Sequence, residues 1–176
     1  MRIVAGSARG RRLVVPEGTD VRPTSDRVRE AVFNALYSLD DAVDGAVVLD
    51  LFAGTGALGL EALSRGAAKV TFVENHRDAA TALSANIAAL GFADRSTVIR
   101  TDARRWLSQA PHFDVAFLDP PYEFADWDSL LSTLSATLAV VESDRSIEVP
   151  GRWELVRERR YGATVVQILR SLASLE

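Results

Sequence analysis

The residues best suited to chemistry are those of Asp119-Pro120-Pro121-Tyr122, which follow an apolar run over residues 114–118. Two prolines withhold backbone donors from a sheet, so packing alone does not explain them. The Asp119 carboxylate and the Pro120 carbonyl could each accept one N–H of a nucleobase exocyclic amine and so expose the nitrogen lone pair. Tyr122 would offer a flat surface to an unstacked base. The alternative is a proline-rich turn with a half-buried tyrosine.

A glycine-rich turn follows the apolar run over residues 47–52. Gly54, Gly56 and Gly59 satisfy the G-x-G-x-x-G spacing, which lets the backbone approach a nucleotide-like ligand where a strand turns into a helix. Taken alone, the spacing also fits an ordinary tight turn. The residues of this segment that we expect to bind a cofactor are Phe52, Gly54, Thr55 and Gly56.

Three acidic residues near predicted strand ends could contact the same ligand. Glu74 could accept hydrogen bonds from both ribose hydroxyls of NAD or S-adenosylmethionine, although it could also be an ordinary surface residue. Asp50 suits a ligand with a free ammonium group, such as the methionine part of S-adenosylmethionine, and would repel a pyrophosphate. Asp102 could accept from an adenine amino group, with Ala103 leaving room for the ring, or cap a helix, or do both.

The elements that position these residues alternate between strands and helices. Strands are expected at residues 47–52, 69–74, 97–100, 114–118 and 138–142, and helices at 57–65, 77–90, 103–109 and 127–137. This alternation is typical of a parallel sheet covered by helices. Residues 153–161 and 163–169 meet at Gly162 and must form an antiparallel hairpin, reached through a bare loop at 143–152.

This layout resembles the class I methyltransferase fold, a Rossmann-like α/β fold with a mostly parallel, seven-stranded sheet that ends in an antiparallel hairpin. In such a sheet the first and fourth strands are neighbours, and their carboxyl ends share one crevice. We therefore expect the glycine-rich turn to lie beside Asp119. A methyl donor and a base amine could then meet there without a metal or a covalent enzyme intermediate.

The amino-terminal residues differ in charge from the rest of the chain. Residues 1–30 hold seven arginines and four acids, whereas the whole chain has a net charge of −4. Residues 2–15 predict a β-hairpin of residues 2–5 and 11–15. A localised positive charge of this kind attracts phosphate backbones, although a solvated surface is the plain alternative. We expect residues 1–21 to be an RNA-contacting extension of a catalytic domain over residues 22–176.

A helix is expected to follow this segment, capped by Thr24 or Ser25. Its apolar positions recur at helical spacing and are Val28, Val32, Ala35, Leu36 and Leu39.

The composition excludes several classes of protein. The chain has 176 residues, of which 48% are hydrophobic and 25% charged, as in one globular domain with a small appendage. It has no cysteine, which excludes disulfides, thiolate metal sites and a cysteine nucleophile. No apolar run approaches the ~20 residues of a membrane helix, and the start lacks a secretion signal. We expect a cytoplasmic monomer without a membrane partner.

Several segments together resemble a known family, the RsmD-type methyltransferases of bacterial small-subunit ribosomal RNA. They are residues 2–6 with 10–13, 22–30, 48–56 and 119–122. The resemblance implies S-adenosylmethionine as methyl donor. It also implies, as acceptor, the N2 amine of the guanine conventionally numbered 966 in 16S rRNA. We expect this small-subunit rRNA to be bound within a ribonucleoprotein particle, although the sequence leaves free RNA and an assembled subunit open as substrates. The residues themselves indicate only the exocyclic amine of a base.

The resemblance further implies that residues 22–30 close over the methionine end of the cofactor, with Arg22 and Thr24 in contact with it, and that the amino-terminal hairpin contacts RNA. The residues expected to contact RNA are Arg2, Arg9, Arg11, Arg12, Arg27 and Pro121. The alternatives are that Thr24 only caps its helix and that Arg27 and Arg29 are solvated.

Other functions stay open at this point. The chain could methylate another base amine, such as adenine N6 or a different rRNA guanine. A nicotinamide-dependent oxidoreductase would share the glycine-rich turn and Glu74, but Asp50 and residues 119–122 argue against it. A non-catalytic RNA-binding module is disfavoured by the intact Asp119 and the intact glycine-rich turn.

Overall fold

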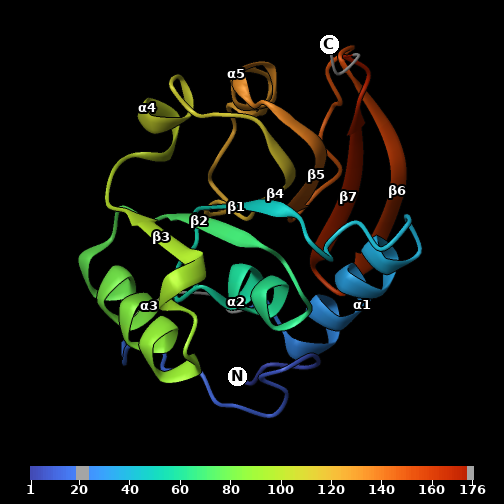
Figure 1. Ribbon diagram of the computed structural model, residues 1–176. Helices are drawn as coiled ribbons and strands as arrows, with labels where there is room; N and C mark the ends of the chain where they lie inside the picture. Colours follow the sequence, from blue (N-terminus) through green and yellow to red (C-terminus); the bar gives the residue numbers. More distant parts are fainter. Residues whose placement is uncertain (19–23, 174–176) are drawn as a thin grey trace.

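One twisted sheet separates two layers of helices in the computed structural model, which describes residues 1–18 and 24–173 (Figure 1). The seven strands run in the order β3-β2-β1-β4-β5-β7-β6, which confirms that the first and fourth strands are neighbours. Strands β1 to β5 are parallel, and β7 lies antiparallel between β5 and β6. The strands are β1 Val47–Leu51, β2 Lys69–Val73, β3 Ser96–Ile99, β4 Phe113–Leu118, β5 Ala136–Ser143, β6 Trp153–Tyr161 and β7 Thr164–Ser171.

Helices cover both faces of the sheet. One layer holds α1 Asp26–Tyr37, α2 Ala57–Ser64 and α3 Arg77–Leu90, and the other holds α4 Ala103–Leu107 and α5 Trp127–Thr133 (Figure 1). A 3-10 helix, Ala93–Arg95, precedes β3. None of the helices within residues 1–18 and 24–173 is long and apolar enough to cross a bilayer.

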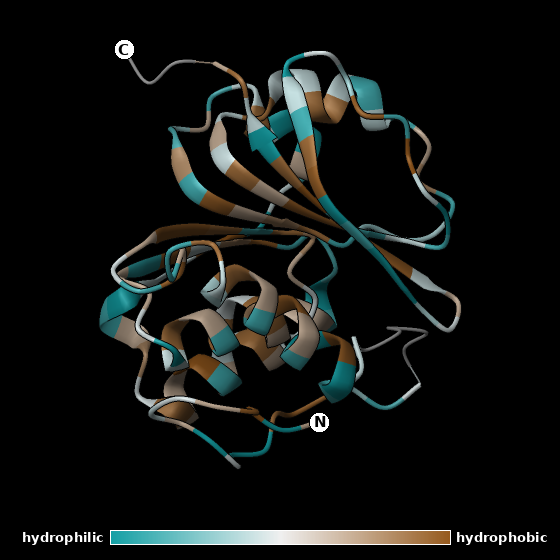
Figure 2. Ribbon diagram, turned by 90° about the vertical axis from the view of Figure 1, so that its right-hand side faces the viewer, coloured by the Kyte–Doolittle hydropathy of each residue, from teal (hydrophilic) through white to brown (hydrophobic). Residues whose placement is uncertain are grey.

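The two layers enclose two separate apolar clusters. Val48 of β1 packs in the cluster beneath α1, α2 and α3, whereas the next residue, Leu49, packs in the cluster beneath α4 and α5. Successive side chains of a strand point to opposite faces, so a strand buried on both sides is apolar throughout. Figure 2 shows this in the brown central strands between the two groups of helices.

Most element boundaries lie within a few residues of those expected. The cap of α1 is Ser25, whose hydroxyl accepts the Val28 amide at 3.2 Å. The helix expected at 127–137 is wrong at its end, because α5 stops at Thr133 and Ala136 already pairs with Phe113 of β4. Residues 144–152 hold neither helix nor strand, which confirms the bare loop.

The expected amino-terminal hairpin is paired only over a short length. Residues 2–15 fold back, with an antiparallel bridge between Arg2 and Arg12 and backbone hydrogen bonds from Ile3 to Arg11 at 2.9 Å and from Leu13 to Met1 at 3.1 Å. The amides of Val4 and Ala5 donate instead to the Glu61 carboxylate of α2. The segment also contributes Ile3, Ala8 and Leu13 to the core beneath α1, α2 and α3.

Candidate active site

The carboxyl ends of the central strands surround a cavity of about 1210 Å³. Strand β1 pairs with β2 on one side and β4 on the other, so the turns that follow all three lie at one edge of the sheet. The sequence-predicted residues that line the cavity are Thr24, Asp50, Phe52, Gly54, Thr55, Glu74, Asp102, Ala103, Asp119, Pro120, Pro121 and Tyr122. Arg22 lies outside the described residues.

Gly54 lines the cavity and Gly56 does not, although the sequence predicts that both glycines bind the cofactor. Its φ is +91°, and a Cβ on it would lie 2.4 Å from Leu83 Cδ1 of α3. A Cβ on Gly59 would lie 2.3 Å from the Phe72 ring of β2. These two glycines therefore let the turn form and let α2 pack closely against α3 and β2.

Asp50 is buried at the end of β1, and its Oδ2 accepts the Gly59 amide at 2.9 Å. This amide belongs to the first turn of α2, whose own N-cap residue is Gly56 and has no side chain to offer. Burial raises the pKa of Asp50 well above its usual range, the Gly59 amide opposes that rise, and the charges of Asp119 and Glu74 add to it. A cationic group bound nearby would offset the cost of ionising Asp50.

Glu74 is fixed by backbone amides on both of its oxygens. Its Oε2 accepts from Gly54 at 2.6 Å and its Oε1 accepts from His76 at 2.7 Å. The carboxylate thus faces the cavity in one orientation, and its further lone pairs can accept from ligand hydroxyls.

Asp102 lines the cavity and also caps α4, because its Oδ1 accepts the Arg105 amide at 3.0 Å. Both functions expected of this residue are thus compatible with one position. Ala103 lines the cavity beside it.

The segment Asp119–Tyr122 forms another wall of the cavity. Pro120 is buried, whereas Pro121 and Tyr122 are exposed at the rim. The Pro121 carbonyl accepts the Phe124 amide at 2.9 Å, which closes a turn after the motif. This arrangement presents a carboxylate inside the cavity and an aromatic ring at its entrance.

Thr24 does not cap α1. Its hydroxyl lies 3.3 Å from Asp119 Oδ2 and 3.2 Å from Glu142 Oε2, and it can donate its one proton to either carboxylate. Thr24, two positions before α1, therefore helps to orient Asp119 after β4 and Glu142 near the end of β5.

An aromatic contact joins the two walls. Phe52 adopts a left-handed φ of +67°, which is uncommon for a residue with a side chain and costs conformational energy. Its ring meets the edge of Phe124 with centroids 5.7 Å apart, and Phe124 in turn meets Trp127 at 5.1 Å. The glycine-rich turn and the loop after Tyr122 are thus held against each other.

Sequence reasoning missed part of the lining. Glu142, Tyr161 and Thr164 also line the cavity, from the ends of β5 and β6 and the start of β7. One signal was present: Glu142 is an acid near the carboxyl end of an apolar strand, as Asp50 and Asp119 are. The other two residues adjoin the turn of the antiparallel hairpin, and their approach depends on its register.

The arginines expected to contact RNA are exposed, but not all extend freely. Arg2 donates to the Gly10 carbonyl at 2.6 Å, and Arg11 donates to the Ala89 carbonyl at 2.7 Å. Ala89 is in the last turn of α3, whose first residue, Arg77, lines the cavity. At 1.5 Å per residue, the contact with Ala89 lies about 18 Å along α3 from that first residue. Arg9 and Arg12 are exposed in the same segment, and Arg27 is exposed on α1.

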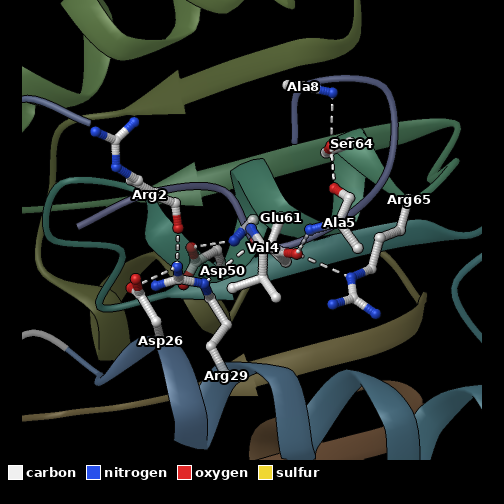
Figure 3. Close-up of polar contacts among 11 residues, drawn as sticks. Arg2, Val4, Ala5, Ala8, Asp26, Arg29, Asp50, Glu61, Ser64 and Arg65 are labelled. Carbon is white, nitrogen blue, oxygen red and sulfur yellow. Dashed lines mark hydrogen bonds and ion pairs between the residues drawn. The ribbon is translucent and has the colours of Figure 1, made fainter. Parts of the chain in front are cut away.

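Arg29 is fully buried, so the alternative that this residue is solvated is wrong. Its guanidinium pairs with Glu61 at 3.2 Å and Asp26 at 2.9 Å and also donates to the Arg2 carbonyl (Figure 3). Glu61 accepts from Arg65 at 2.9 Å as well. This network binds the amino-terminal segment to α1 and α2 beside the cavity.

The chain is similar to known proteins over most of its length. The model of the family named Conserved hypothetical protein 95 matches residues 1–170. The Ribosomal RNA small subunit methyltransferase D of Haemophilus influenzae is 39% identical, over 92% of this chain and 89% of the relative. The protein of the same name from Escherichia coli is 37% identical, over 100% of this chain and 92% of the relative.

Solved structures agree with the sequence comparison. The structure of yhhF from Escherichia coli has a TM-score of 0.87 and 36% identity, and the match covers 99% of both chains. A structure of a hypothetical protein from Thermus thermophilus has a TM-score of 0.80 and 31% identity over 96% of this chain and 98% of the other.

Proposed function

The chain belongs to the family that this model describes, which includes the ribosomal RNA small subunit methyltransferases D, and from that membership we propose that it transfers a methyl group from S-adenosylmethionine to the N2 amine of a guanine in small-subunit ribosomal RNA. The guanine is the one conventionally numbered 966. The observation that carries the proposal is one shared cavity, which is lined by the turn after β1, by Glu74 directly after β2 and by the Asp119–Tyr122 segment.

One half of the cavity fits the cofactor. Glu74, held by two backbone amides, would accept from the ribose hydroxyls, and Asp102 with Ala103 would contact the adenine. The buried Asp50 carboxyl would face the ammonium of the methionine part. When bound, S-adenosylmethionine supplies an electrophilic methyl group on a sulfonium, and the sulfur becomes a neutral thioether when its bond to that methyl group breaks.

The other half fits the acceptor. The Asp119 carboxylate and the Pro120 carbonyl would each accept one N–H of the amine, and the rigid prolines would hold both acceptors in place. As the nitrogen gains the methyl group, it would lose one proton to the Asp119 carboxylate, which passes it to solvent. Pro121 and the exposed ring of Tyr122 would support a base that has left its stack. Thr24, within hydrogen-bond distance of Asp119, would steady the carboxylate.

The basic amino-terminal segment would bind phosphates of the RNA outside the cavity. Arg9 and Arg12 are the exposed charges best placed for this, because Arg2 and Arg11 are engaged with backbone carbonyls. In this proposal residues 1–21 are an RNA-contacting extension, Arg27 adds a contact on α1, and the protein acts as a monomer on a ribonucleoprotein particle.

Two measurements test the proposal. The purified chain, incubated with isotope-labelled S-adenosylmethionine and small-subunit rRNA or subunits from cells that lack this protein, should yield N2-methylguanosine on nucleoside mass analysis. Mapping should place the label at one guanine. Label in N6-methyladenosine would instead support the methylation of a different base amine.

Equilibrium binding separates the enzyme classes. S-adenosylhomocysteine should bind and NAD should not. A clear preference for NAD would overturn the methyltransferase proposal, since the glycine-rich turn and Glu74 are features that both classes use.

A further inference from the structure

A second carboxylate lies beside Asp119 at the edge of the sheet. Leu118 of β4 pairs with Val141 of β5, so the residues that follow them, Asp119 and Glu142, extend from neighbouring strands at the same level. Glu142 is 7% exposed and lines the cavity. Both carboxylates lie within hydrogen-bond distance of one atom, Thr24 Oγ1.

The transfer proposed above uses only one of these carboxylates. Asp119 and Pro120 grip the amine that receives the methyl group, and Glu142 has no part in that step. Glu142 nevertheless lines the same cavity from the neighbouring strand. The chemistry of the base indicates a function for this second carboxylate.

Guanine presents two kinds of donor next to each other: the N2 amine and the ring N1–H. Adenine presents an amine next to a ring nitrogen that carries a lone pair. A carboxylate accepts hydrogen bonds and cannot donate them when ionised. Placed beside the site that grips the amine, it would accept the N1–H of guanine and repel a base with a lone pair there. Enzymes that act on extruded bases read this edge with hydrogen bonds.

We propose that Glu142 is the specificity-determining residue that accepts the N1–H of the target guanine while Asp119 and Pro120 hold its N2 amine. This inference rests on the proposed guanine-N2 methylation and adds the group that selects the base. The Thr24 hydroxyl can then orient either carboxylate: Asp119, which holds the amine, or Glu142, which accepts the N1–H.

The test uses a base that keeps the amine and lacks the neighbouring proton. 2-Aminopurine has the same exocyclic 2-amine as guanine, but its N1 is an acceptor. Small-subunit rRNA carrying either base at the methylated position is prepared by ligation and assayed alone and after reassembly into particles. The wild-type chain should methylate guanine on the order of 100-fold faster than 2-aminopurine, because a site built to accept a hydrogen bond rejects an analogue that lacks it.

The variant Glu142→Gln keeps the shape of the side chain and adds an amide that can donate to the N1 lone pair. It should slow the methylation of guanine and speed that of 2-aminopurine, so that the ratio of the two rates falls at least about tenfold. Glu148→Gln is the matched control, since Glu148 is exposed on the loop after β5 and does not line the cavity. It should leave the ratio unchanged.

Each outcome separates the proposals. A wild-type chain that methylates neither base contradicts the proposed function itself. A Glu142→Gln variant that binds S-adenosylhomocysteine normally and keeps the wild-type ratio, whether both rates are unchanged or equally reduced, overturns the role of Glu142. If the variant does not fold, equal rates on guanine and 2-aminopurine in the wild-type chain overturn it as well.

Discussion

Arg29 of α1 and Glu61 of α2 form an ion pair whose two side chains are both fully buried (Figure 3). Removing the Glu61 charge leaves the buried Arg29 guanidinium with only the exposed Asp26 carboxylate as a charged partner. Loss of one partner of a buried ion pair typically destabilises a protein by about 3–5 kcal/mol. Glu61→Gln should therefore lower the free energy of unfolding by roughly that amount in urea titrations. Glu30→Gln, an exposed acid on α1, should change it by less than about 0.5 kcal/mol. Equal stability of the two variants would show that the pair contributes little.

Asp119→Ala should reduce methyl transfer by at least about 100-fold, because the amine loses an acceptor that aligns its lone pair. The affinity for S-adenosylhomocysteine should stay nearly the same, since the carboxylate acts on the acceptor base. Single-turnover kinetics and calorimetry measure the two quantities separately. Asp128→Ala, an exposed acid of α5, serves as control. Turnover close to normal in the Asp119 variant would remove this residue from the mechanism.

Asp50 should make the ligand-free protein less stable as the pH rises. Burial raises the pKa of Asp50 in the folded state above its unfolded value. Between the two values the folded state therefore binds more protons than the unfolded state, and the stability falls with increasing pH. Asp50→Asn removes this contribution. The variant should gain stability relative to wild type from about pH 4 towards neutral pH, as followed by thermal unfolding without ligand; a difference that is constant with pH would contradict the raised pKa.

Cofactor binding should be coupled to the same proton. An ammonium group beside Asp50 favours the ionised carboxylate, so binding of S-adenosylhomocysteine should release a proton near the pH at which Asp50 titrates in the ligand-free protein. Calorimetry in buffers of different ionisation enthalpy measures that release. It should disappear in Asp50→Asn, together with part of the affinity. Identical proton release by both proteins would assign the coupling to another group.

Arg9→Ala with Arg12→Ala should weaken RNA binding and flatten its dependence on salt. Each lost phosphate contact reduces the slope of log affinity against log salt by roughly 0.7–0.9. Arg9 and Arg12 are chosen because Arg2 and Arg11 also donate to backbone carbonyls. Substituting Arg2 or Arg11 would therefore disturb the fold as well as the charge. A double alanine variant of Arg157 and Arg170, which are exposed on strands β6 and β7, is the control. If the double variant has the same RNA affinity as wild type across a salt series, Arg9 and Arg12 do not contact RNA.

The sequence was sufficient for the sheet and for parts of the cavity lining, because both depend on local patterns. Apolar runs of about four to eight residues define the strands, and the order of a doubly wound sheet then places Gly54 beside Asp119. The sequence marks Glu142 as an acid near the end of an apolar strand, but not its position level with Asp119. That position depends on the pairing of Leu118 with Val141, which no pattern within β4 or β5 specifies.

Two local expectations left out the contribution of a distant side chain. The amides of Val4 and Ala5 fit a hairpin in the sequence, yet they bind a carboxylate more than fifty residues away. Gly56 fits a ligand-binding turn, yet it faces Leu83 in the packing of α2 against α3. In each case the deciding partner comes from another helix, and a short window of sequence does not contain it.

The edge-to-face contact of Phe52 with Phe124 has a consequence for binding. It connects the turn that would hold one reactant to the loop that would hold the other, so occupation of either side changes the freedom of both. Thermodynamic linkage makes such an influence reciprocal. Saturating RNA should therefore alter the affinity for S-adenosylhomocysteine by the same factor by which that ligand alters the affinity for RNA, and Phe124→Ala should bring this factor close to one.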